Sequence, residues 1–187
     1  MLNIIAGSLS VGVTPSTNSY ESIATVSLGS SQSSIEFTSI PSTYTHLQLR
    51  GISRTDRAVS LTYLKMQFNA AAGTAYSYHA LIGNGTAAST DATSNDAWIT
   101  ILRSTGTSAT ASIFAPTVID ILDYKDTNKY KTTRALGGAD LNGSGEIVFQ
   151  SGLWRSTSAI TSIKFTDATG SNFVQYSSFA LYGIKGA

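Results

Sequence analysis

The chain has 187 residues, a formal net charge of +1, 12% charged residues and no cysteine. The lack of cysteine excludes disulfides, thiolate nucleophiles and cysteine-ligated metals. Lysine and arginine are scattered, whereas a nucleic-acid-binding face needs them clustered, so we expect no nucleic-acid partner. No apolar run approaches the roughly 20 residues that span a bilayer, so we expect no membrane partner. The opening MLNIIAGSLSVGV lacks the positive region of a signal peptide, which favours synthesis in a cytoplasm.

The first 19 residues differ in character from those that follow. An apolar cluster is followed by the polar, proline-containing segment GVTPSTNS. We therefore predict an arm and linker over residues 1–19 and a single β-sandwich domain over residues 20–187. Our hypothesis is that the arm docks on a partner through four residues: Met1, Leu2, Ile4 and Ile5. The alternative is that the arm adds an edge strand to its own sandwich.

From Tyr20 onward the sequence predicts short strands separated by turn signals such as GNGTAASTDATSND (83–96). We expect eleven strands, at residues 21–28, 34–38, 44–52, 61–68, 76–82, 97–103, 110–122, 129–136, 145–153, 159–166 and 173–184. Apolar and polar residues alternate clearly in three segments, THLQLR, TYLKMQF and TSIKF. The apolar phase of that alternation predicts seven core residues: Leu47, Leu49, Leu64, Met66, Phe68, Ile163 and Phe165.

Many short antiparallel strands in about 165 residues predict an all-β fold, an antiparallel two-sheet sandwich and specifically a jelly roll. Serine and threonine are abundant where charged residues are scarce, and they suit turns and half-buried strands. The absence of a repeat at a fixed period argues against a propeller or β-helix.

The residues that could support catalysis are few. The two histidines, His46 and His79, lie in predicted strands, and the chain lacks the G-x-S-x-G signature of a serine hydrolase. We expect both to be ordinary strand residues. If the protein were an enzyme, the first carboxylates to inspect would be Glu21, Glu36 and Glu146. We expect no enzymatic activity and no cofactor.

The acidic segment IDILDYKDTNKY (119–130) has two interpretations. Asp120, Asp123, Asp126 and Asn128 could supply oxygen ligands to calcium, although their spacing is not that of an EF-hand loop. The favoured interpretation is a strand followed by a turn in which aspartate and asparagine side chains accept hydrogen bonds from turn amides. We therefore expect no metal site.

The two tryptophans also have two interpretations. Trp98 and Trp154 stand beside aliphatic residues at predicted strand positions. Large aromatic side chains in such settings usually fill a core or a subunit interface, and we favour this interpretation. The alternative is a platform on which sugar rings stack.

Five segments carry a resemblance to a known group of proteins. They are FTSIPSTYTHLQLRGISR (37–54), YSYHALIGNG (76–85), IDILDYKDTNKYKTTRAL (119–136), SGLWRSTSAITSIKF (151–165) and YSSFALYGIKGA (176–187). In these segments the chain resembles small virion structural proteins of tailed bacteriophages, many from aquatic and cyanobacterial hosts. The resemblance covers nearly everything after residue 33, and such proteins offer no catalytic residues to transfer.

The resemblance implies a virion protein that is assembled in the host cytoplasm and contacts other virion proteins, namely major capsid or tail proteins. We expect a capsid decoration (cement) protein. The alternative is a module of a tail fibre or spike that binds host surface glycan. A surface with little charge and many aromatic residues favours a homo-oligomer, and we expect a homotrimer.

Overall fold

The computed structural model describes residues 19–186, which form twelve β-strands and no α-helix. The strands are β1 (Tyr20–Ser27), β2 (Ile35–Phe37), β3 (His46–Ser53), β4 (Leu61–Phe68), β5 (Tyr76–Gly83), β6 (Ala88–Asp96), β7 (Ile99–Thr105), β8 (Ala115–Leu122), β9 (Lys131–Asp140), β10 (Gly145–Trp154), β11 (Ile163–Asp167) and β12 (Ser178–Ile184). Within this described range no helix is long and apolar enough to cross a bilayer.

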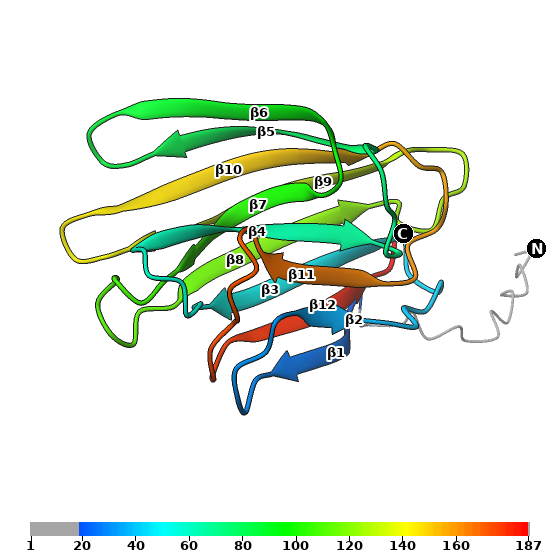
Figure 1. Cartoon of the computed structure of the whole chain (residues 1–187). Coiled ribbons are helices and arrows are strands. Elements are labelled where there is room, and N and C mark those ends of the chain that lie inside the picture. Colours follow the sequence, from blue (N-terminus) through cyan, green and yellow to red (C-terminus); the bar gives the residue numbers. More distant parts are fainter. Residues whose placement is uncertain (1–18, 187) are drawn as a thin grey trace, which may run out of the picture.

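The strands form two antiparallel sheets that pack as a sandwich (Figure 1). The large sheet has eight strands in the order β1-β12-β3-β8-β9-β10-β5-β6, and the small sheet has four in the order β2-β11-β4-β7. This result confirms the predicted antiparallel sandwich. Without the hairpins β5–β6 and β9–β10, eight strands remain, which can be renumbered 1 to 8 in chain order. Their order is then 1-8-3-6 in the large sheet and 2-7-4-5 in the small sheet, which is the jelly-roll arrangement.

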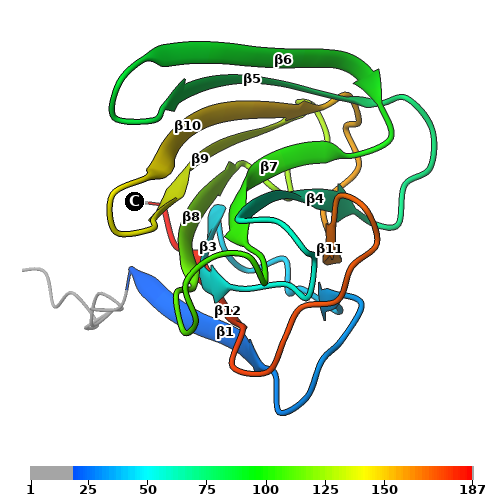
Figure 2. The same ribbon diagram turned by 60° about the vertical axis from the view of Figure 1, so that its left-hand side comes forward.

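The two additional hairpins widen only the large sheet. β9 and β10 continue it beyond β8, and β5 and β6 complete its far edge. Figure 2 shows β5 and β6 extending past β7, the edge strand of the small sheet. The small sheet therefore covers the inner face of the large sheet only in part, and the outer face of the large sheet is a broad surface that crosses eight strands.

One predicted loop is a strand. The cluster at 83–96 was expected to be a turn, but residues 88–96 form β6 and pair with β5 along its length. The turn is confined to residues 84–87, where Asn84 Oδ1 accepts hydrogen bonds from the amides of Thr86 and Ala87. The prediction failed because β6 is a polar edge strand, so it carries no apolar phase that alternation could reveal.

The predicted core is confirmed. All seven residues on the apolar phase of the alternating strands are buried, with no exposed surface: Leu47, Leu49, Leu64, Met66, Phe68, Ile163 and Phe165. Phe165 of the small sheet stacks on Phe179 of the large sheet, with ring centroids 5.0 Å apart. The buried Gln150 on β10 donates a hydrogen bond to the carbonyl of Thr100 on β7 and so joins the sheets.

The proposed docking residues Met1, Leu2, Ile4 and Ile5 lie outside the described residues, so the docking hypothesis stays a prediction. The boundary of the predicted arm at residue 19 also stays a prediction. What the structure describes is the point at which the sandwich begins, with Tyr20 opposite Ile184 at the start of β1.

Candidate interaction surface

A row of apolar side chains crosses the outer face of the large sheet. The strand register places Leu81 of β5 opposite Phe149 of β10, Phe149 opposite Leu136 of β9, and Leu136 opposite Val118 of β8. Directly opposite residues on adjacent strands have Cβ atoms about 5 Å apart, so the four side chains form a continuous ladder. Ile147 lies two residues before Phe149 on the same face. We call these five residues, Leu81, Val118, Leu136, Ile147 and Phe149, the apolar face.

The apolar face is open to solvent in the described structure. Its side chains are between 38% and 60% exposed, with Val118 the least exposed and Ile147 the most. β8 also carries apolar residues on its other phase, where Ile119 and Ile121 are fully buried. Strands that are apolar on both phases are typical of sheets covered on both sides. The sequence of this sheet therefore fits a surface that a partner covers.

A shallow hollow of about 750 Å³ adjoins the ladder. It surrounds Ile147 because its two cross-strand neighbours, Gly83 and Gly138, have no side chains. Gly138 has a φ of +153°, and a Cβ atom there would lie 2.0 Å from the carbonyl oxygen of Glu146, so this position requires glycine. The volume lies within the range of binding pockets, about 300–1,000 Å³.

The opposite end of the same face is polar and satisfies its own hydrogen bonds. Gln48 Nε2 donates to Asp120 Oδ1 (2.7 Å), Arg134 Nη2 donates to Asp120 Oδ2 (2.8 Å), and Arg50 Nε donates to Gln48 Oε1 (2.9 Å). Burial alone would raise the pKa of Asp120, but the hydrogen bonds from Gln48 and Arg134 hold it below its ordinary value. These polar side chains already form hydrogen bonds with one another, whereas the apolar face offers only hydrophobic contacts.

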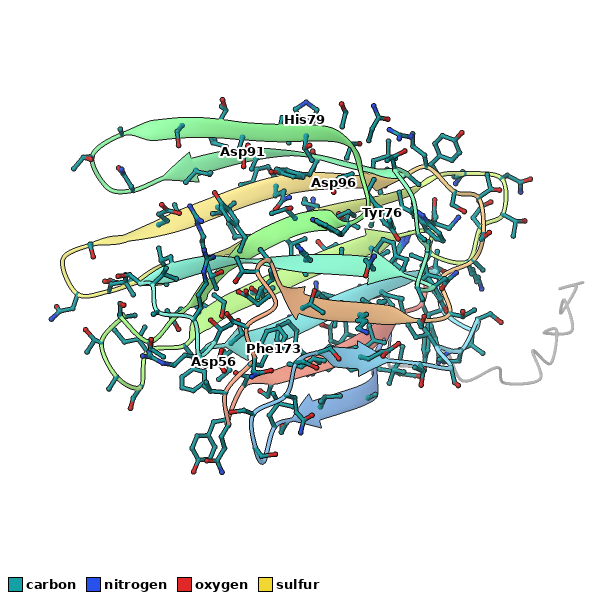
Figure 3. The ribbon with its side chains drawn as sticks, in the orientation of Figure 1. Asp56, Tyr76, His79, Asp91, Asp96 and Phe173 are labelled. Atoms are coloured by element: carbon teal, nitrogen blue, oxygen red, sulfur yellow. The ribbon has the colours of Figure 1, made fainter. Side chains whose placement is uncertain are left out.

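The histidines lie apart, on β3 and β5. His46 Nδ1 accepts a hydrogen bond from the amide of Asp123 (2.9 Å), which gives it a structural role in the turn after β8. His79 is exposed on the outer face, and its cross-strand neighbour is Ser151. No side-chain hydrogen bond joins His79 to Ser151 in the part of the chain that the structure describes. Figure 3 shows His79 on the β5–β6 side of the molecule, away from Asp56 and Phe173.

The acidic segment after β8 forms the predicted turn. Asp126 Oδ1 accepts hydrogen bonds from the amide (2.7 Å) and the side chain (3.2 Å) of Asn128. Lys129 Nζ lies 2.7 Å from Asp123 Oδ2 and also pairs with Asp126. Asp120 belongs instead to the polar end of the outer face, where it pairs with Arg134. Among residues 19–186 no three potential metal-binding side chains converge.

The two tryptophans have different environments. Trp154 is 3% exposed and packs against Phe68 and Tyr76, so its predicted place in the core is confirmed. Trp98 precedes β7 rather than lying within the strand, and Lys65 Nζ sits 3.7 Å from the centroid of its ring. A lysine on the ring face competes with a stacked sugar, because both use the same π surface.

The three glutamates have different environments. Glu21 on β1 accepts hydrogen bonds from Lys185 and Tyr44, which hold its pKa below the ordinary value. Glu36 is exposed on β2 of the small sheet. Glu146, at the start of β10, forms an ion pair with Arg103. They thus lie on three different strands, and two of them are held by cationic side chains.

The apolar face was not identified from the sequence. A usable signal was present in segments such as HALIG, TVIDIL and EIVF, which are apolar on both strand phases.

The chain matches no protein-family model, no curated protein and no solved structure.

Proposed function

We propose that the protein is a non-enzymatic structural component of a bacteriophage virion, and specifically a capsid decoration protein. In this proposal it attaches to neighbouring subunits through the apolar face. The observation that carries the proposal is the ladder Leu81–Phe149–Leu136–Val118, exposed on a sheet whose other face carries the core. Exposed apolar patches of this kind mark interaction sites.

The size of the face supports attachment by many copies together. Five large side chains, each about half exposed, present roughly 450 Å² of apolar surface, and its burial contributes about 11 kcal/mol at 25 cal/mol per Å². Loss of translational and rotational freedom opposes association by about 4–15 kcal/mol. A single contact is therefore weak, whereas a lattice of copies gains strongly from multivalency. A decoration protein binds in such a lattice.

Decoration is favoured over a glycan-binding module of a tail fibre or spike. Sugar recognition uses aromatic faces that are free to stack. Two candidate rings are occupied, because Lys65 lies over Trp98 and Arg103 lies 3.6 Å from the ring centroid of Tyr63. The jelly roll itself does not decide between the two functions, because it occurs in both viral capsid and lectin domains. The low charge and the resemblance to virion proteins support a place in a particle.

Labelling of this protein in intact virions tests the proposal. Gold-conjugated antibody against the chain should mark the capsid surface at regular positions in electron micrographs. Label confined to the tail tip would contradict decoration, and particles without the chain would contradict a virion role. A glycan array provides the matched measurement for the alternative, and we expect no binding above that of a denatured control.

A further inference from the structure

We propose that the apolar face receives residues 1–9 of a neighbouring copy, so that the subunits exchange arms around a closed homo-oligomer. This inference deepens the proposed function, because it names a second copy of the chain as the partner of the face. It also gives the docking hypothesis for Met1, Leu2, Ile4 and Ile5 a specific receptor.

The chemistry of the two surfaces matches. The sequence of residues 1–19 contains no charged side chain, and five of its first nine residues are large and apolar: Met1, Leu2, Ile4, Ile5 and Leu9. The five residues of the apolar face are also uncharged, and the hollow around Ile147 leaves room beside them. Burial of these arm side chains on the face leaves no ionised side chain without a partner.

The size of the face fits a segment better than a second copy of itself. The face presents roughly 450 Å² of apolar surface, whereas a stable interface buries about 800 Å² on each partner. Face-to-face packing through these five residues alone is therefore too small for a stable dimer. In a ring of arm exchange each copy makes two such contacts, one through its arm and one through its face, whereas a face-to-face dimer makes one.

The direction of the chain at β1 favours a neighbour's face over the chain's own. Lys185 N donates a hydrogen bond to Ser19 O (2.9 Å), so the pairing of β1 with β12 still holds at Ser19. In the strand register Val118 lies opposite Arg50, Arg50 opposite Ala180, and Ala180 opposite Thr25. The ladder is therefore level with Thr25, near the C-terminal end of β1. At Ser19 the N-terminal end of β1 therefore points away from the level of the ladder. A receiving face that lies ahead of this end, on a neighbour, requires no reversal of chain direction.

The linker is long enough for exchange. Ten residues, 10–19, span up to about 33 Å when extended, and the sheet from β1 to β9 is about 19 Å wide at 4.8 Å per strand. The arm and the face that receives it are different surfaces, so the contact is heterologous, and such contacts form a ring when the rotation between copies closes. We expect a ring of three.

Two variants of the full chain test the exchange. Ile4→Asp/Ile5→Asp alters the arm and leaves the face intact, and Leu136→Asp alters the face and leaves the arm intact. Leu136 is 50% exposed, so the substitution does not disturb the core. The control is Leu122→Asp, at a leucine that is 41% exposed on the same outer face but four residues from Val118 along β8. Melting curves confirm that each variant is folded.

Native mass spectrometry and analytical ultracentrifugation at micromolar concentration give the readout. We expect trimers for the wild type and for Leu122→Asp, and monomers for the arm variant and the face variant separately. An equimolar mixture of the two monomeric variants, concentrated until a single weak contact is populated, should form a 1:1 pair, because one supplies the arm and the other the face. A monomeric wild type overturns the exchange but leaves attachment to the particle to be judged by the labelling experiment. An arm variant that stays oligomeric, or a mixture that stays monomeric, also overturns it.

Discussion

Truncation of two phenylalanines, one in the core and one on the outer face of the large sheet, tests the assignment of the core. Phe165 has no exposed surface and stacks on Phe179, whereas Phe149 on the apolar face is 52% exposed. Phe165→Ala and Phe149→Ala remove the same atoms from the two environments. Because the chemistry is identical, the difference in free energy of unfolding reports burial alone.

The magnitudes follow from the area that each ring buries. A fully buried phenylalanine removes about 200 Å² from water, and its truncation to alanine costs about 3–5 kcal/mol. The stacked pair with Phe179 places Phe165 toward the upper end, at about 4 kcal/mol. Phe149 loses only partial burial and its contacts with Leu81 and Leu136, which amount to about 1 kcal/mol.

Urea denaturation of the isolated domain lacking residues 1–12, which cannot exchange arms, measures both effects by tryptophan fluorescence. With an m-value of about 2 kcal/mol per M, Phe165→Ala should lower the midpoint by about 2 M and Phe149→Ala by about 0.5 M, with m unchanged. A loss below about 1 kcal/mol for Phe165→Ala would show that the strand faces are wrongly assigned. Equal losses for the two variants would show that the outer face is already covered in the isolated protein.

Three further substitutions test particular interactions. Burial alone would raise the pKa of Asp167, but hydrogen bonds from Thr169 and Thr62 hold it below its ordinary value. The ionised form therefore stabilises the fold at neutral pH, and this contribution should disappear as the pH falls from about 5 to 2. When the free energy of unfolding is measured across this pH range, Asp167→Asn should show a smaller change than the wild type. Lys131→Met should cost about 2–4 kcal/mol in urea denaturation, because three backbone carbonyls lose the buried Nζ that donates to them. Lys129→Met, at an exposed lysine, should cost much less, and equal losses for the two variants would contradict this role of Lys131. Gly138→Ala should lower stability by about 2 kcal/mol or more, because its Cβ meets the Glu146 carbonyl, and a loss under about 0.5 kcal/mol would contradict that geometry.

The core and the acidic turn could be predicted because their signals are local. Alternation in TYLKMQF places Leu64, Met66 and Phe68 on one side wherever the strand pairs. The turn at 123–128 depends on Asp126 and Asn128, which are two residues apart in the sequence. In both cases the residues that determine the structure are neighbours along the chain.

The apolar face and β6 required information that local patterns do not contain. Leu81, Phe149, Leu136 and Val118 come from four strands, and they form a row only because of the register between those strands. Alternation assigns one phase of each strand to the core, so the second apolar phase in β8 and β10 was not interpreted. β6 is held by backbone pairing with β5, and its polar side chains give no periodic signal.

Hydroxyl-radical footprinting of Leu136 and Phe149 in the assembled particle, compared with the isolated domain lacking residues 1–12, tests most directly whether the apolar face is an interaction surface. Both side chains are about half exposed in the structure, with 50% for Leu136 and 52% for Phe149, so both should be oxidised readily in the isolated domain. In particles we expect their oxidation to fall several-fold, while the exposed Tyr176, which is outside the apolar face, is oxidised equally in both samples. Equal oxidation of Leu136 and Phe149 in the particle and in the isolated domain would contradict an interaction through the apolar face.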